Sequence, residues 1–179
     1  DGGFVMGGYS ISLPGTGNKT SPNYGNYDFW VVRLDADGNK LWDKSFGGSS
    51  SDELYSLQQA SDGGFILGGY SNSAAGTGDK TSPRCGGYDF WVVRLDADGN
   101  KLWDKSFGGS SSDYLYSLQQ ASDGGFILGG YSSSAAGTGN KTSPYYGGHF
   151  GDFWVVRLDA NGNMLWDKSF GGKSCCART

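Results

Sequence analysis

The chain has 179 residues, of which 36% are hydrophobic, 15% are aromatic and 33 are glycine, and its formal net charge is −4. The hydrophobic fraction lies below the ~45–50% usual for globular domains, and large aromatic side chains compensate by filling space between flat layers. An acidic chain without a run of Lys or Arg lacks the basic surface of a nucleic-acid-binding protein, and its apolar stretches are too short to span a bilayer. Nucleic-acid binding and membrane insertion are therefore not expected.

The sequence repeats itself from its first residues. Asp1-Gly2-Gly3-Phe4 returns at Asp62 and again at Asp123, 61 residues apart each time. A fixed period of this size indicates stacked copies of one supersecondary unit, so the fold and any site have to be considered copy by copy.

In chain order, the first predicted element is a strand over residues 4–10, and a long polar connection separates it from a hairpin. The hairpin is clearest in the second copy, where Phe-Trp-Val-Val-Arg-Leu at 90–95 precedes the turn Asp98-Gly99 and a second strand at 101–107. A further hairpin joins 114–120 to 126–131 through the turn at 122–125. Each repeat is therefore predicted to contain four antiparallel strands.

A helix is the competing prediction for residues 50–57, where Ser50 and Glu53 fit a capping box and Leu54 and Leu57 lie three residues apart. The next copy has Tyr114 in place of Glu53, and only about seven residues separate the turn signals, a length that suits a strand. The strand is the favoured interpretation.

The predicted strands carry apolar residues on both faces, with Leu102 on one side and Trp103 and Phe107 on the other. This pattern predicts sheets that are covered on both sides. Four-stranded sheets packed face to face around an axis form a β-propeller. The predicted fold class is therefore an all-β propeller of four-stranded antiparallel blades, with three blade equivalents per chain.

The run D-F-W-V-V-R-L-D-A-D-G-N-K-L-W-D-K-S-F-G-G, followed by L-Q-Q-A-S-D-G-G-F-I-L-G-G-Y-S, resembles a bacterial β-propeller repeat of about sixty residues. Such repeats are common in predicted secreted or cell-surface proteins, so the resemblance implies a location outside the cell or on its surface. It covers residues 1–172 and implies no particular activity, since propellers host many functions.

The repeat region is expected to span residues 1–172, with a non-repeat tail at 173–179. Its predicted units are an unpaired fourth strand at 1–13, blades at 28–73 and 89–134, and an unpaired hairpin at 152–172. Three blades are too few for a ring. Two chains supply six, with the hairpin of one completed by the first strand of the other, which predicts a homodimer closed by strand exchange. The alternative is a fragment of a longer ring.

Two motifs suggest ion or phosphate binding, and each departs from its consensus pattern. Asp96-Ala97-Asp98-Gly99-Asn100 matches the opening of a calcium loop, but Lys101 follows where glycine is required and the final Glu is missing, so a hairpin turn is favoured. Residues 76–81 are similar to a phosphate loop, but Asp79 interrupts the motif and no helix is predicted after it. No metal or cofactor is therefore predicted.

Catalytic patterns are equally weak. The single histidine, His149, belongs to one copy only, and the single glutamate, Glu53, has no counterpart in the other copies. A repeated carboxylate pair of the glycosidase kind is therefore not supported, although aspartates could still meet across blades. No catalytic residue is predicted, and an enzyme is not expected.

The long connections near 12–27, 72–88 and 133–152 exceed the usual loop length, which is typical of functional or disordered loops. Their Thr-Gly-Asp/Asn-Lys-Thr-Ser-Pro segments are predicted to stand beside the Gly-Gly-Ser-Ser-Ser-Asp turns and to offer hydroxyl, amide and ammonium groups to a sugar or a polar protein surface. The alternative is that they only carry the chain over the blade. The candidate binding residues are Asn18, Lys19, Thr20, Asp79, Lys80, Thr81, Asn140, Lys141, Thr142 and Tyr145.

The predicted function is a non-enzymatic propeller scaffold or interaction module, secreted or on the cell surface, that presents repeated polar loops to a protein or glycan partner. One alternative is a multivalent, lectin-like carbohydrate-binding protein with one weak site per repeat. A second alternative is a hydrolase with its site at the central opening.

Overall fold

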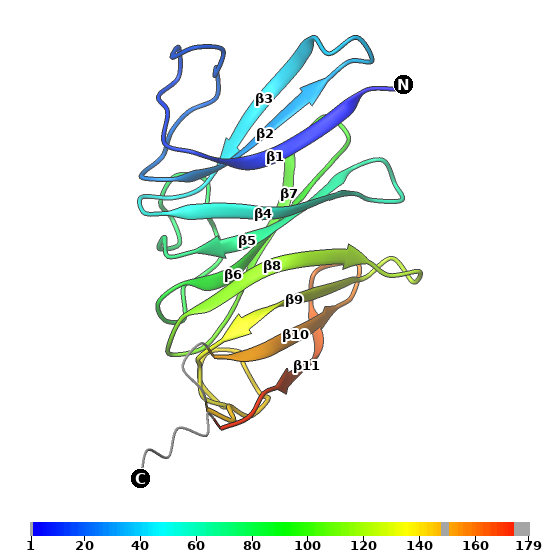
Figure 1. Cartoon of the computed structure of the whole chain (residues 1–179). Coiled ribbons are helices and arrows are strands. Elements are labelled where there is room, and N and C mark those ends of the chain that lie inside the picture. The colour runs from blue at the N-terminus through cyan, green and yellow to red at the C-terminus, as the bar shows by residue number, and fades with distance from the viewer. Residues whose placement is uncertain (1, 148–150, 174–179) are drawn as a thin grey trace.

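The computed structural model describes residues 2–147 and 151–173. Within them the chain forms eleven strands and no helix, and the strands make three antiparallel sheets that follow one another through the molecule (Figure 1). The first sheet contains β1 (Phe4–Ser10), β2 (Asp28–Leu34) and β3 (Lys40–Phe46); the second contains β4 (Asp52–Gln59), β5 (Phe65–Ser71), β6 (Asp89–Leu95) and β7 (Lys101–Phe107); the third contains β8 (Asp113–Gln120), β9 (Phe126–Ser132), β10 (Asp152–Leu158) and β11 (Met164–Phe170).

The all-β class is confirmed, and residues 52–59 are a strand rather than a helix. Each tight hairpin forms where its turn residues predict it. In the Asp96–Asn100 turn, for example, Gly99 takes a φ of 76°, which a residue with a side chain rarely adopts. No helix long and apolar enough to cross a membrane occurs among the residues placed by the structure.

The sheets do not follow the predicted blade boundaries. The predicted blade 28–73 covers β2 to β5, but β2 and β3 pair with β1, whereas β4 and β5 pair with β6 and β7. The predicted blade 89–134 is divided in the same way, between the second and third sheets. The long connection 72–88 therefore joins neighbouring strands of one sheet, with Ser71 opposite Asp89, and the short segments 47–51 and 108–112 cross between sheets.

Neither of the two units predicted to be unpaired is unpaired. β1 pairs with β2 from Phe4 opposite Leu34 to Ser10 opposite Asp28, and β10 of the predicted hairpin pairs with β9 along its length. Strand exchange of the predicted kind is therefore wrong for this structure, because the first strand and the last hairpin already have ladder partners within the chain. The predicted tail 173–179 lies, apart from its first residue, outside the described residues.

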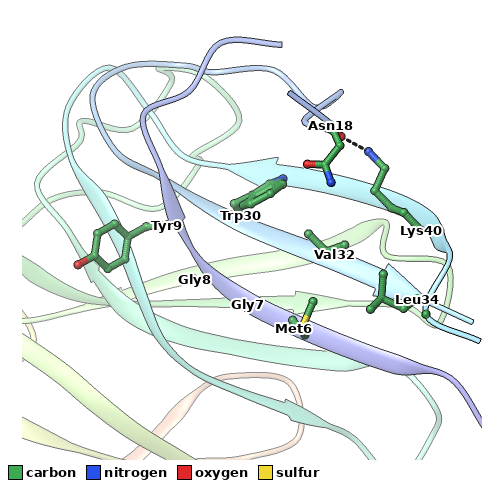
Figure 2. A pocket seen from close by; sticks show the side chains of 10 residues that line it. Met6, Gly7, Gly8, Tyr9, Asn18, Trp30, Val32, Leu34 and Lys40 are labelled. Carbon is green, nitrogen blue, oxygen red and sulfur yellow. Dashed lines mark hydrogen bonds between the residues drawn. The ribbon is translucent and has the colours of Figure 1, made fainter. Parts of the chain in front are cut away.

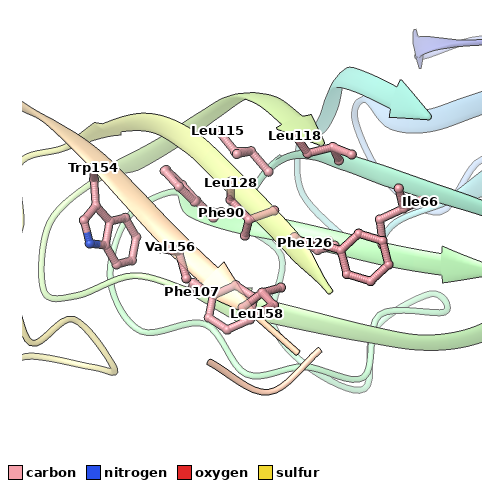
Figure 3. Close-up of a cluster of buried hydrophobic side chains, with 11 residues drawn as sticks. Ile66, Phe90, Phe107, Leu115, Leu118, Phe126, Leu128, Trp154, Val156 and Leu158 are labelled. Carbon is pink, nitrogen blue, oxygen red and sulfur yellow. The ribbon is translucent and has the colours of Figure 1, made fainter. Parts of the chain in front are cut away.

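Two clusters of buried side chains fill the spaces between the sheets. The first joins Phe29 and Val31 of the first sheet to Trp91 and Val93 of the second. The second cluster lies between the second and third sheets, and Phe90 is one of its members (Figure 3). β5 and β6 are buried along their whole length, as expected for strands covered on both faces. The two end sheets each leave one face open.

Candidate functional site

The long connections lie beside the short segments that cross between sheets, as the sequence predicts. The amide of Asp79 donates to the carbonyl of Gly47 (2.9 Å), and the amide of Gly47 donates back to the Asp79 carboxylate (2.8 Å). The amide of Ser49 donates to the Thr77 hydroxyl (3.1 Å). In the next copy Asn140 replaces Asp79 and its side-chain oxygen accepts from the amide of Gly108 (2.9 Å). Asp79 and Asn140 therefore stabilise the contact between each long connection and the segment that crosses between sheets.

The predicted binding lysines lie inside the molecule. Lys80 is 1% exposed, and its ammonium donates to the Ser82 carbonyl (2.7 Å), the Ser82 hydroxyl (3.1 Å) and the Ser106 hydroxyl (2.9 Å). An ammonium group has three donors, so all of them are used. Burial lowers the pKa of Lys80, while the Asp104 carboxylate opposes this shift. Lys19 and Lys141 are buried in equivalent places.

The predicted threonines close the same network from the outside. The Thr81 hydroxyl and amide both bond the carboxylate of Asp104 on β7, which also accepts from the indole N–H of Trp91 (3.0 Å). Burial by itself raises the pKa of Asp104, but the hydrogen bonds from Thr81, Trp91 and Ser82 outweigh it and hold that pKa below its ordinary value. Thr20 bonds Asp43 and Thr142 bonds Asp167 in the same manner, which anchors each long connection to the outer strand of its sheet.

The two remaining predicted residues lie nearer the surface. Asn18 is exposed, and its carbonyl accepts a hydrogen bond from Lys40 (Figure 2). Tyr145 is 38% exposed in the third long connection. The structure thus gathers the predicted Lys, Thr, Asp and Asn residues into repeated anchoring networks rather than into one open surface.

The motif that resembles a calcium loop forms a closed turn. The Asp96 carboxylate accepts from the amides of Asp98 (3.0 Å) and Asn100 (2.8 Å) and from the Asn100 side chain (2.9 Å). Across residues 2–147 and 151–173, no group of three or more His, Cys, Asp or Glu side chains is placed to hold a metal ion. The single histidine, His149, lies outside the described residues.

Aspartates from neighbouring sheets do meet, but in the interior. Asp28 and Asp52 are both 0% exposed, and a Cβ added to Gly47 would lie 2.1 Å from Asp28 Oδ1 and 2.9 Å from Asp52 Oδ2. Burial raises the pKa of Asp28 to about 7, and the Asp52 carboxylate adds to the shift. Asp89 and Asp113 form an equivalent pair, and burial raises the pKa of Asp89 to about 6. Full burial keeps both pairs away from any substrate.

The open site is an aromatic cluster that the sequence analysis did not identify. Tyrosines from all three sheets lie ring against ring: the Tyr9 and Tyr55 centroids are 5.8 Å apart, those of Tyr55 and Tyr116 are 5.2 Å apart, and those of Tyr70 and Tyr114 are 4.8 Å apart. We call this the tyrosine cluster; its members are Tyr9, Tyr27, Tyr55, Tyr70, Tyr88, Tyr114, Tyr116 and Tyr131.

Hydroxyl groups and one carboxylate sit at the centre of the tyrosine cluster. The Tyr55 and Tyr70 hydroxyls are 2.9 Å apart, and they lie 3.1 Å and 2.9 Å from Glu53 Oε2. Burial raises the pKa of Tyr70. The hydrogen bond with Tyr70 lowers the pKa of Tyr55, but burial and the Glu53 carboxylate outweigh it and raise that pKa to about 12. Both phenols therefore stay neutral at physiological pH.

A sequence signal for this cluster exists. Tyr9, Tyr70 and Tyr131 occupy one repeat position, and Tyr55 and Tyr116 another. The register places Glu53 opposite Tyr70 and Tyr114 opposite Tyr131, so the positions lie on paired strands. Recurrence of tyrosine at fixed positions could have indicated the cluster, whereas the contacts between sheets required the tertiary structure.

Comparisons with known proteins show a partial similarity to a curated protein. No protein-family model matches the chain. The chain is similar to "Regulatory protein FlaEY" of Caulobacter vibrioides, with 27% identity over 175 residues. The match covers 94% of this chain and 18% of that protein, so the chain spans a small part of the length of this curated relative.

Proposed function

We propose that the chain is a non-enzymatic binding module of the β-propeller type, which contacts its ligand through the tyrosine cluster. The observation that carries the proposal is the exposure of Tyr9, Tyr55 and Tyr116, each 42%, on rings that contact one another across three sheets. Soluble proteins rarely leave contiguous aromatic surface open unless something binds there. The resemblance of the repeats to those of secreted or surface bacterial proteins supports an extracellular or surface location.

The propeller arrangement is supported by the way the first strands of neighbouring sheets meet. The amide of Leu118 on β8 donates to the Ser56 hydroxyl on β4 (3.1 Å), and the amide of Gln120 donates to the Gln58 side chain (2.8 Å). Blades of a propeller converge on its axis along one edge strand each. We place β4 and β8 at that inner edge, so Tyr55 and Tyr116 lie close to the axis.

A neutral carbohydrate is the ligand class that the tyrosine cluster favours. Exposed ring faces provide apolar surface for the C–H faces of a sugar, and neutral phenols with the Glu53 carboxylate can exchange hydrogen bonds with its hydroxyls. The long connections are less suited to this role, because Lys19, Lys80 and Lys141 are buried.

The positions of the carboxyl groups favour binding without catalysis. Hydrolysis of a glycosidic bond generally uses two carboxyl groups flanking the bond. In the described part of the chain, Glu53 is the carboxylate bonded to the tyrosine cluster, while Asp28 and Asp52 are fully buried. The similar Caulobacter protein is named a regulatory protein, and a binding module suits such a role.

The test is a glycan array on the full chain, followed by calorimetric titration of the best neutral oligosaccharide. Tyr55→Ala and Tyr116→Ala each remove an exposed ring and are expected to weaken binding at least about tenfold, equivalent to ~1.4 kcal/mol. Tyr145→Ala is the matched control, since Tyr145 is 38% exposed but belongs to a long connection. Absence of any glycan binding, or an equal loss with Tyr145→Ala, would contradict the proposal.

A further inference from the structure

The same aromatic contact is built at both boundaries between sheets. Phe29 of the first sheet lies 4.6 Å from Trp91 of the second, and Phe90 of the second lies 4.7 Å from Trp154 of the third, measured between ring centroids. Each phenylalanine also lies over a glycine on the strand next to the tryptophan. A Cβ added to Gly69 would lie 1.9 Å from the Glu53 carbonyl oxygen on the neighbouring strand and 2.9 Å from Phe29 Cζ, so only glycine fits between that strand and the ring.

A second contact accompanies the first at the outer edge. Trp42 of the first sheet lies over the Gly99 turn of the second sheet, and a Cβ added to Gly99 would be 2.9 Å from the Trp42 ring. The ring centroids of Trp42 and Phe65 are 6.4 Å apart. Trp103 packs on Gly162 and Phe126 of the third sheet in the same way. Each boundary thus joins a Phe and a Trp on one sheet to a Trp, two glycines and a Phe on the next.

The third and first sheets expose the two halves of this contact. On the third sheet, Phe153 is 59% exposed and Trp166 is 44% exposed, although the equivalent Phe29 and Phe90 are fully buried. Phe153 contacts Tyr131 of its own sheet, at 5.0 Å between centroids.

The first sheet carries the receiving half. No atom lies within 4 Å of a Cβ added to Gly8 or Gly38, and Phe4 is 57% exposed. Gly8, Gly38, Met6 and Trp30 border a cavity of about 440 Å³ (Figure 2). This cavity occupies the position that a phenylalanine fills at the internal boundaries, because Gly8 lies opposite Trp30 as Gly69 lies opposite Trp91.

We propose that the third sheet of one chain docks on the first sheet of a second copy, and that the reverse contact closes a ring of two chains. Phe153 of one copy enters the cavity beside Gly8 and Trp30 of the other, and Trp166 covers Gly38 and Phe4. A polar contact at the rim accompanies the boundary between the first and second sheets. There the Lys44 ammonium donates to the Asp98 carbonyl (2.9 Å) and to Asn100 Oδ1 (3.0 Å) of the second sheet. Lys168 and the turn at 37–39 are the counterparts of these groups at the new boundary.

A second copy is the occupant that the structure itself supports. The docking faces continue an interface that the chain already builds twice, with the same residue types at the same register positions. Head-to-tail contacts between identical chains either close or extend without limit. Propellers have about four to eight blades, and six is the multiple of three in that range. The number of chains rests on the propeller arrangement proposed above, but not on ligand binding.

The new boundary differs from the internal ones at its inner edge. β4 and β8 place leucines against the preceding sheet, so a Cβ on Gly7 would lie 2.6 Å from Leu54 Cδ2 and one on Gly68 would lie 2.3 Å from Leu118 Cδ2. Among residues 2–147 and 151–173, the first sheet contains β1 to β3 and has no strand at this position. The cavity of about 510 Å³ beside Gly129 therefore stays open at each of the two new boundaries.

The test is the mass of the full chain in solution, by sedimentation velocity over a hundredfold range of concentration and without added glycan. The expected species has twice the 19.0 kDa mass of one chain. Phe153→Ser removes an exposed side chain, and Gly8→Leu fills the cavity, so each variant is expected to fold and to sediment as a single chain. Circular dichroism checks that both variants retain their strands.

Leu165→Ser is the matched control on the same sheet. Leu165, Leu41 and Leu102 occupy one repeat position and are each 57% exposed, so this position plays no part in contacts between sheets, and the variant is expected to remain a dimer. Mixing Phe153→Ser with Gly8→Leu restores one intact boundary and is expected to give a heterodimer. A single-chain mass for the unmodified protein, a species larger than two chains, or a dimer that survives both substitutions would each overturn the proposal.

Discussion

The phenyl ring of Phe90 lies 4.7 Å from the indole ring of Trp154, although the two residues belong to different sheets. Both side chains are 0% exposed, and the Trp154 indole N–H also donates to the Asp167 carboxylate (2.9 Å). One tryptophan therefore joins an apolar boundary between sheets to the polar network that anchors the long connection.

Replacing Phe90 by Ala is expected to destabilise the protein by about 3–5 kcal/mol, because the substitution leaves a cavity between two sheets. Urea unfolding followed by tryptophan fluorescence measures the loss. Leu102→Ala is the control, since Leu102 is 57% exposed and its truncation is expected to change stability by no more than about 0.5 kcal/mol. Equal losses in the two variants would show that the boundary between the sheets contributes little.

Gly68 and Gly129 occupy the same repeat position but are expected to respond differently to alanine. A Cβ on Gly68 would lie 2.3 Å from Leu118 Cδ2, whereas no atom lies within 4 Å of a Cβ on Gly129. Gly68→Ala is expected to cost about 1–3 kcal/mol through overpacking, and Gly129→Ala is expected to be neutral or stabilising. Thermal unfolding of the two variants checks this, and a loss with Gly129→Ala alone would contradict it.

Lys80 is expected to act in stability and not in binding. Lys80→Met keeps most of the apolar stem but removes the ammonium that donates to the Ser82 carbonyl and the Ser106 hydroxyl, while the Ser82 and Ser106 hydroxyls can still bond each other. We therefore expect a loss of about 1–3 kcal/mol with unchanged ligand affinity. Arg84→Ala, at an exposed position of the same connection, is expected to alter stability by less than about 0.5 kcal/mol. A selective loss of affinity in Lys80→Met would restore the long connections as the binding surface.

Asp28 is expected to make stability fall as the pH rises. Its pKa in the folded protein is about 7, whereas an unfolded Asp titrates near about 3.9, so its favourable contribution is complete below pH ~4 and is lost as the pH rises through about 7. Asp89, with a pKa raised to about 6, acts in the same direction. Asp104 and Asp167 have lowered pKa values, so the stability they contribute is present above pH ~4 and is lost progressively as the pH falls below it.

Asp28→Asn tests this assignment, because the amide stays neutral and its oxygen can still accept from the Tyr24 amide, which lies 2.7 Å from Asp28 Oδ2. Between pH 5 and pH 8, the free energy of unfolding of the variant is expected to rise relative to that of the unmodified protein. Asp98→Asn is the control, since Asp98 is exposed and the third copy has Asn161 at this position. A constant difference across that range would show that Asp28 does not titrate there.

The sequence predicted the strands well where local chemistry decides. Phe90 to Leu95 and Lys101 to Phe107 are strands, and the Asp98-Gly99 turn between them forms as predicted. The choice of strand over helix at residues 52–59 was also correct, since turn signals bounded a segment too short for a helix. These features depend on residues close together in the chain.

The grouping of strands into sheets was decided by tertiary structure. Hairpin patterns predict that β6 pairs with β7 and that β8 pairs with β9. They do not say whether β7 shares a sheet with β8 or whether β5 pairs with β6 across the connection 72–88. The ladder from Phe65 opposite Leu95 to Ser71 opposite Asp89 settles it. Pairing over such a separation depends on packing of whole sheets, which no local pattern encodes.

The positions of functional groups show the same division. The sequence by itself determined the all-β class, through its strand and turn patterns, and the recurrence of Lys, Thr and Tyr at fixed repeat positions. Burial of Lys80 and exposure of Tyr55 and Tyr116 were decided only by the stacking of the sheets. The physical reason is that turn geometry and strand preference depend on residues close together in the chain, whereas exposure depends on which distant surfaces come together.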